Sequence, residues 1–158
     1  MASIPMTAQG AKRLAAELKN LKAVVRPEVI EAISTARAQG DLSENAEYDA
    51  AREKQAFVEG RIKELESVLS SANVIDPSTL DVDGQVVFGA TVELVDLDTD
   101  AEITYQIVGD FEADIKQNTI SVSSPVARAL IGKSVGDTIT VRTPAGEREY
   151  EVLDVHYR

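Results

Sequence analysis

The sequence predicts an α+β protein. An antiparallel α-helical coiled-coil hairpin over residues 1–75 is followed by a small antiparallel-sheet domain with one short helix over residues 76–158. In the first part, apolar residues recur at alternating spacings of three and four, which is the period of a coiled coil. From Asp76-Pro77 onward, short alternating runs bounded by Gly, Pro and Asp clusters indicate strands. Aromatic residues make up only 4% of the chain, so we expect an aliphatic core.

The first arm of the hairpin is predicted to begin after Thr7, a good N-cap residue. A coiled-coil seam then runs at spacings of four, three and four through Leu14, Leu18, Leu21 and Val25.

Pro27 interrupts this seam. Inside a helix a proline removes one backbone hydrogen bond and kinks or strains the helix. Because apolar residues resume with Ile30 and Ile33, we expect one long, bent helix to about Gln39. Gly40 is a suitable stop, since glycine adopts the left-handed cap without a Cβ penalty.

The second arm shows the same seam at spacings of four, three, four and three, through Val58, Ile62, Leu65, Leu69 and Ala72. Two long helices joined by a short loop must run antiparallel. We therefore expect the hairpin to present the segment GDLSEN at its tip.

The second half predicts five strands, in QVVFGATVELVDL, AEITYQIVG, NTISV, DTITVRT and REYEVLDVHY, with a hairpin around PAGE. Between strands, SSPVARALIGK predicts a short helix with Ser124 as N-cap, Pro125 at its first position and Gly132 as its stop. His156 is a lone histidine without a neighbouring Ser, Cys or second His, and we expect it on a strand face.

Charge separates the two halves. The net charge is −11, but residues 1–75 carry 10 Lys/Arg against 11 Asp/Glu, whereas residues 76–158 carry 6 against 16. An acidic domain repels nucleic acid and suits a protein partner. The chain has no cysteine, no apolar run of the roughly 20 residues that a membrane span needs, and no secretory signal pattern. We expect a cytoplasmic protein without a membrane partner.

The tip segment GDLSENAEYD supports two interpretations of Asp41 and Glu44. Their spacing is that of a capping box, with Asp41 as the N-cap of the second helix and Glu44 reaching back. Alternatively, the two carboxylates bind a divalent cation. Two carboxylates cannot form a complete cage, so Mg²⁺ would be held well only beside the ligands of another site. In that case the tip donates a second metal ion to a two-metal phosphodiester cleavage site.

Four segments resemble the Gre family of bacterial transcript-cleavage factors: GDLSENAEYDAAREKQAFVEGRIKELE, PMTAQGAKRLAAEL, and the C-terminal FGATVELVDLDTDAEITYQIVGDFEAD and ISVSSPVARALIGKSVGD. The resemblance covers essentially the whole chain. It is closer to the GreA branch than to GreB, whose tip region is more basic. It implies a C-terminal domain similar to FK506-binding-protein folds.

The resemblance also implies a function. Gre factors are transcription elongation factors that dock at the rim of the secondary channel of RNA polymerase, on its largest subunit, and insert their coiled coil. Two tip acids, here Asp41 and Glu44, hold a weakly bound Mg²⁺ shared with the polymerase, which then cleaves the extruded 3′ end of a backtracked RNA. From this resemblance we expect a monomer that is not an enzyme by itself and that contacts DNA only indirectly, as part of the transcription complex.

Further residues are assigned by the same resemblance. Arg37 and Arg52 match a basic patch that guides the RNA 3′ end, with Lys54 a weaker candidate. From the sequence alone, these arginines would be solvated or paired with Glu47, Asp49 or Glu53. Polymerase docking is assigned to Ser121, Val122, Pro125 and Val126. Near the tip, Tyr48 and Leu42 are expected to be packing residues.

Three other functions stay open. A Gre-like protein that enters the channel and inhibits has the same scaffold, but it needs no matched pair of tip acids. A peptidyl-prolyl isomerase is suggested only by the FK506-binding-like fold, which is weak evidence, and such sites use a more aromatic pocket. A coiled-coil scaffold or holdase would need only the rod and would tolerate neutral residues at the tip.

Overall fold

The computed structural model describes residues 3–39, 45–80 and 82–158. Contacts divide the chain into two compact units. One comprises residues 12–71, and the other comprises residues 1–11 together with residues 72–158. The sequence boundary between residues 75 and 76 stays a prediction, and the elements of each unit are described separately below.

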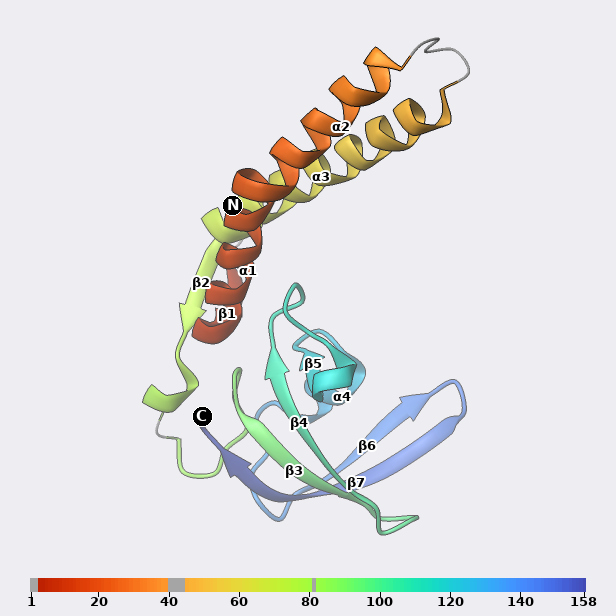
Figure 1. The fold of residues 1–158 in the computed structure, drawn as a ribbon. Coiled ribbons are helices and arrows are strands. Elements are labelled where there is room, and N and C mark those ends of the chain that lie inside the picture. The colour runs from red at the N-terminus through yellow and green to blue at the C-terminus, as the bar shows by residue number, and fades with distance from the viewer. Residues whose placement is uncertain (1–2, 40–44, 81) are drawn as a thin grey trace. The chain divides into compact units, whose positions relative to one another are not determined.

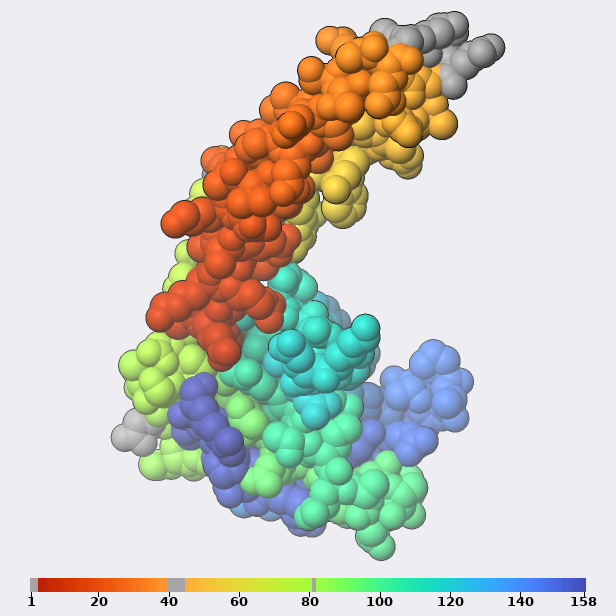
Figure 2. Space-filling view, viewed as in Figure 1, coloured from red at the N-terminus to blue at the C-terminus, as the bar shows by residue number. Residues whose placement is uncertain are grey.

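The helical unit is a hairpin of two arms that lie side by side (Figures 1 and 2). The first arm consists of α1 (Ala8–Asn20), the π-helical segment η1 (Leu21–Val25) and α2 (Arg26–Ala38). The second arm is α3 (Ala46–Ser70). The predicted pair of long helices is therefore present, and the first arm is helical without a break up to Ala38.

The π-helical segment explains how the first arm accommodates Pro27. The backbone N–H of Arg26 bonds to the carbonyl of Leu21, five residues back, directly before the proline that lacks an N–H of its own. The wider π turn inserts one extra residue into the seam. As a result Val29 is buried, whereas Ile30 is 53% exposed, so the prediction that Ile30 continues the apolar face was wrong.

The second arm also departs from its predicted seam near its end. Val68 is buried and Leu69 only half-buried, because the 3.6-residue helical period steps by three at this point rather than by four. Ala72 does not belong to the helix at all, since α3 ends at Ser70 and a strand follows.

Apolar packing and ion pairs join the two arms. The core of the hairpin is formed by Val29, Ile33, Ala51, Val58 and Ile62. Along its surface, the Arg26 guanidinium donates two 2.8 Å bonds to the Glu59 carboxylate, and Arg61 donates to Glu17 at 2.7 and 3.0 Å. Arm-to-arm pairs of this kind add little energy at an exposed surface, but they fix the register of the arms.

The second unit begins with a strand pair that the sequence analysis missed. Strand β1 (Ile4–Thr7) pairs in parallel with β2 (Ala72–Ile75), so that Ile4 lies opposite Ala72. Four residues at each end of a long helical insertion form this pair. Local patterns in sequence do not show a pairing between segments so far apart.

The larger sheet has the strand order β5-β4-β3-β7-β6 (Figure 1). Its strands are β3 (Thr91–Asp96), β4 (Glu102–Val108), β5 (Thr119–Ser121), β6 (Thr138–Thr143) and β7 (Gly146–His156). All five predicted strands and the hairpin around PAGE are confirmed. Within this sheet, β4 and β5 pair in parallel. Two single 3-10 turns, Pro77–Thr79 and Ile115–Gln117, lie in the connections.

The short helix α4 (Pro125–Leu130) covers this sheet and is capped as predicted, with the Ser124 side chain accepting a bond from the Ala127 N–H. The domain core is aliphatic, and its larger fully buried side chains include Leu94, Ile107 and Leu130. The predicted α+β class, a helical hairpin followed by a mainly antiparallel sheet with one short helix, is confirmed. Among the described residues, no helix is both long and apolar enough to cross a membrane.

Candidate functional site

The hairpin end is the predicted site, and the structure gives the two helix ends that flank it. Asp41 and Glu44, the two predicted metal-binding acids, lie outside the described residues, as do Leu42 and Gly40. On the first arm, α2 ends at Ala38 with Gln39 as its C-cap, close to the predicted end.

The second arm begins with Asn45, which makes two side-chain hydrogen bonds. Its Oδ1 accepts a 3.1 Å bond from the backbone N–H of Tyr48, which is the bond an N-cap residue makes. Its Nδ2 donates a 2.7 Å bond to the carbonyl oxygen of Ala36, in the last turn of α2. One side chain thus caps the second helix and binds the end of the first.

This arrangement corrects the predicted capping box. In one of the two interpretations of the tip acids, Asp41 is the N-cap of the second helix and Glu44 its reciprocal acid, but α3 starts at Ala46 and Asn45 is its N-cap. An asparagine caps as well as an aspartate, and its amide group also supplies the donor that Ala36 requires. The start of α3 therefore does not account for the two acids.

Tyr48, one turn into α3, is a packing residue as predicted. It is half-buried and packs against the core of the hairpin. Between the arms, an open groove of about 630 Å³ is lined largely by alanines, by the three acids Glu28, Glu31 and Glu47, and by one lysine, Lys54. This groove is not suited to an RNA phosphate, because its acidic lining repels one.

The predicted basic patch lies on both arms. Arg37 is in the last turn of α2, and Arg52 is within the first two turns of α3. Both side chains are exposed, as is that of Lys54. Neither arginine forms an ion pair with Glu47, Asp49 or Glu53, so within the described part of the chain the alternative of an arm-to-arm pair finds no support.

The four predicted docking residues come together at the end of β5 and the start of α4. Ser121 is half-buried and offers a hydroxyl, and Pro125 is exposed and offers an apolar ring. The side chains of Val122 and Val126 are half-buried and also pack against the domain core. The segment is held by backbone bonds, from Val122 N–H to the Val108 carbonyl at 2.8 Å and from Ser124 N–H to the Ser121 carbonyl at 2.9 Å.

A residue that the sequence analysis missed, Asp110, organises this segment from the turn after β4. Its Oδ1 accepts hydrogen bonds from the hydroxyls of Ser121 and Ser123, the latter at 2.7 Å. The Ser121 bond in particular, together with that of Ser123, holds the pKa of the Asp110 carboxyl below its usual range. The signal in the sequence was a turn-forming Gly-Asp pair directly after a strand.

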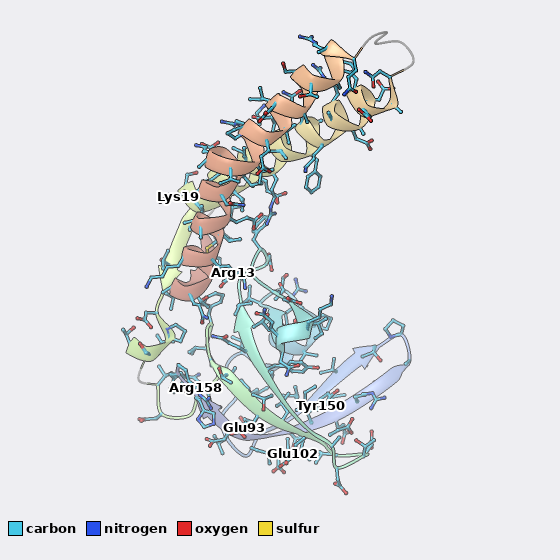
Figure 3. The ribbon with its side chains drawn as sticks, in the orientation of Figure 1. Arg13, Lys19, Glu93, Glu102, Tyr150 and Arg158 are labelled. Carbon is cyan, nitrogen blue, oxygen red and sulfur yellow. The ribbon has the colours of Figure 1, made fainter. Side chains whose placement is uncertain are left out.

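His156 lies on β7, as predicted for a strand-face histidine. Its Nε2 is 2.7 Å from a carboxylate oxygen of Glu93 on β3 and 3.5 Å from one of Asp154 (Glu93 is labelled in Figure 3). The three ligand atoms lie within 4.8 Å of one another. The contact between His156 and Glu93 joins the neighbouring strands β7 and β3, so it is accounted for as a cross-strand side-chain contact.

Comparison with protein families identifies both parts of the chain. Residues 4–74 match the family model of the N-terminal domain of transcription elongation factors, and residues 81–157 match that of the GreA/GreB C-terminal domain. The two models cover both the helical hairpin and the sheet domain.

Individual relatives match over the full length. The transcription elongation factor GreA of Xylella fastidiosa (strain 9a5c) is 64% identical over 153 residues, which is 97% of each chain. The transcription elongation factor GreA of Alkalilimnicola ehrlichii is 60% identical over 157 residues, which is 99% of each chain. Among solved structures, Gfh1 of Thermus aquaticus is 30% identical over 99% of each chain, with a TM-score of 0.45.

Proposed function

Since this chain belongs to the GreA/GreB family of transcription elongation factors, we propose that it stimulates RNA cleavage by backtracked RNA polymerase, with its hairpin tip inserted into the secondary channel. The observation that carries the proposal is the match of two family models, which together extend over nearly all of the chain. RNA polymerase performs the cleavage, and the factor is not an enzyme by itself.

We assign the metal-binding role to Asp41 and Glu44. Carboxylate oxygens are the ligands that Mg²⁺ prefers, and two of them leave most coordination positions to other donors, so the donor set fits an ion that is shared with a second site. When bound, a second Mg²⁺ stabilises the charge that develops on a phosphodiester during an in-line displacement. The chain's own contribution is to hold two carboxylates at the end of a stiff hairpin.

The capping of α3 by Asn45 supports this role. If Asp41 and Glu44 capped α3, that alone would explain why two acids precede the helix. Because Asn45 already bonds to the Tyr48 N–H, that reason does not apply to the start of α3. The acids then need another explanation, and metal binding is the one that the family suggests.

The remaining parts of the proposal concern the partners. Arg37 and Arg52 face solvent on the two arms and would guide the RNA 3′ end, since a guanidinium binds phosphate by paired hydrogen bonds. The segment with Ser121, Val122, Pro125 and Val126 would dock on the largest subunit at the channel rim. The factor would act as a monomer, in the cytoplasm.

The test is transcript cleavage on purified backtracked polymerase complexes in the presence of Mg²⁺. We would compare the wild type with Asp41→Asn and Glu44→Gln, each of which removes one charge and keeps the shape of the side chain. Asp49→Asn is the matched control, because Asp49 is an acid in the first turn of α3. Competition with a labelled wild-type factor measures polymerase binding.

We expect both tip variants to bind polymerase like the wild type but to lose at least about a hundredfold in cleavage rate, as for the loss of a charged group that acts only in the transition state. The control should cleave normally. Normal cleavage by both tip variants would overturn the assignment of the acids. If the wild type itself binds and slows RNA synthesis without cleavage, the chain is instead an inhibitor on the same scaffold.

A further inference from the structure

Glu112 is a buried carboxylate in the turn that follows β4, and only 3% of the residue is exposed. Its Oε2 accepts a 2.7 Å hydrogen bond from the N–H of Gly109 in its own turn. The same oxygen accepts a 2.9 Å bond from the N–H of Thr7, 105 residues earlier in the chain. The Thr7 hydroxyl donates to its other oxygen, Oε1. All these residues belong to one compact unit.

Thr7 is the N-cap of α1, as predicted. Its Oγ1 accepts a 3.1 Å bond from the N–H of Gly10, the third residue of the helix. In an ordinary capping box, that third residue is Glu or Gln, and its side chain accepts the bond from the N-cap N–H. Here the third residue is a glycine, and Glu112 accepts that bond instead.

Two glycines make room for the carboxylate. A Cβ at Gly10 would lie 1.8 Å from Glu112 Oε1. A Cβ at Gly109 would lie 2.3 Å from the carbonyl oxygen of Pro5 and 2.9 Å from Glu112 Oε2. None of these three distances is compatible with a side chain. A larger residue at position 10 would displace the carboxylate, and one at position 109 would displace both the Pro5 carbonyl and the carboxylate.

We propose that Glu112 completes a split capping box and thereby acts as a positioning residue, which ties the root of the first helical arm to the C-terminal domain. The helix that it caps continues without a break through η1 and α2 to Ala38. The inference rests on the proposed function, because a factor that docks with one domain and works with the tip of a hairpin needs the first turn of that hairpin's helix to be held in place.

Capping of α1 and its attachment to the C-terminal domain are two separate effects, and the position of the acid decides which of them it provides. An acid at position 10 would cap α1 locally, with no link to the C-terminal domain. An acid at position 112 does both at once. Each hydrogen bond to a charged acceptor shifts the opening equilibrium of the bonded amide by about ten- to a hundredfold. Loss of the Glu112 bonds should therefore be measurable as faster hydrogen exchange of the individual amides that donate them.

The experiment uses the full chain in three variants. Glu112→Ala removes the carboxylate, and Glu112→Gln keeps an acceptor oxygen without the charge. The double variant Gly10→Glu/Glu112→Ala supplies an acid at the third helical position, in the space that the Glu112 side chain vacates. Glu102→Ala, an exposed acid on β4, is the matched control (Glu102 is labelled in Figure 3).

The first readout, amide hydrogen exchange, does not involve polymerase. In Glu112→Ala we expect the Thr7 and Gly109 amides to exchange at least about tenfold faster. In the double variant Thr7 should regain protection while Gly109 does not. Glu112→Gln should lie between the wild type and Glu112→Ala. Unchanged exchange at both amides in Glu112→Ala would overturn the split capping box.

The second readout is cleavage by backtracked polymerase as a function of factor concentration. We expect Glu112→Ala and the double variant to reach half-maximal cleavage at a near-normal concentration but with a maximal rate about tenfold lower, because the docking segment is intact while the first turn of α1 is no longer bonded to the turn after β4. Full recovery of the maximal rate in the double variant would overturn the positioning role and leave only capping.

These outcomes are separable from a failure of the proposed function. If the wild type does not stimulate cleavage, the proposed function fails, and with it the positioning role. The exchange measurement still decides whether Glu112 completes the cap. If Glu112→Ala does not fold, the double variant and Glu112→Gln give the same comparisons.

Discussion

The side-chain amide of Asn45 donates a 2.7 Å hydrogen bond to the carbonyl oxygen of Ala36, so the residue that begins α3 also holds the end of α2. The two arms are therefore fixed to each other on both sides of the acidic segment. A site that must present two carboxylates to a partner benefits from such a fixed base, because less conformational freedom is lost on binding.

The two bonds of Asn45 can be separated by mutation. Asn45→Ala should destabilise the hairpin by about 1–2 kcal/mol through loss of the cap and of the bond to Ala36. Asn45→Asp keeps the cap but places a carboxylate oxygen where the amide donor faced the Ala36 carbonyl, so it should also destabilise the hairpin, by about 1–2 kcal/mol, while the Tyr48 N–H stays bonded. Urea unfolding followed by circular dichroism measures both. Exchange of the Tyr48 amide should rise in the alanine variant alone, and a rise in both would contradict the assignment.

The arginines of the basic patch should affect cleavage and not binding. Arg37→Ala and Arg52→Ala each remove an exposed guanidinium without breaking an ion pair to a described residue. We expect about a tenfold lower cleavage rate for each, in line with one hydrogen-bonded charge contact to phosphate, and unchanged competition for polymerase. Lys54→Ala, on the same arm as Arg52, is the comparison. Equal losses in all three variants would point to general electrostatics rather than to a guiding patch.

Asp110 should matter for docking, because it fixes Ser121 and Ser123. Asp110→Ala removes the shared acceptor, and we expect polymerase affinity to fall about tenfold while cleavage at saturating factor stays normal. Asp98→Asn is the control, since Asp98 is an exposed acid in the turn after β3 and the variant has the same net charge. If the affinity for polymerase stays the same in Asp110→Ala, either this segment does not dock or docking does not require Asp110 to hold Ser121 and Ser123 in place.

The buried Asp96 gives a pH-dependent prediction for the sheet domain. The pKa of its carboxyl is held below the ordinary value of 3.8, first by the Asp98 N–H and further by the Arg148 guanidinium, 2.9 Å away. A lowered folded-state pKa stabilises the fold above the ordinary value, and this contribution is lost as the pH falls through the folded-state pKa. Asp96→Asn should therefore be less stable than the wild type at pH 7 and at pH 5, and the difference should shrink below pH 3.8.

Urea unfolding midpoints at pH 7, 5 and 3 test this expectation. Asparagine keeps an oxygen for the N–H groups of Asp98 and Thr99, so the comparison isolates the charge. Glu147→Gln is the control, because the exposed pair of Glu147 with Arg142 should contribute little at any pH. A difference between Asp96→Asn and the wild type that is the same at all three pH values would contradict the charge-based account.

Local sequence patterns predicted most of the elements. The arms, the strands, the hairpin around PAGE and the caps Thr7 and Ser124 follow from spacing and from residues that favour caps and turns. These features depend on neighbours a few residues apart, which a sequence displays directly. The family resemblance also rests on contiguous segments and could be stated from them.

Tertiary structure decided what depends on distant partners. Asn45 rather than Asp41 is the N-cap of α3, and its side chain also reaches the Ala36 carbonyl across the hairpin. Val29 replaces Ile30 in the core, because a π turn before Pro27 shifts the register. The acid that completes the cap of α1 comes from position 112, since a helix whose third residue is Gly10 has no acid of its own there. Local sequence patterns thus determined most of the helices and strands, whereas long-range hydrogen bonding and packing determined the β1–β2 pair and the residues that end and join the elements.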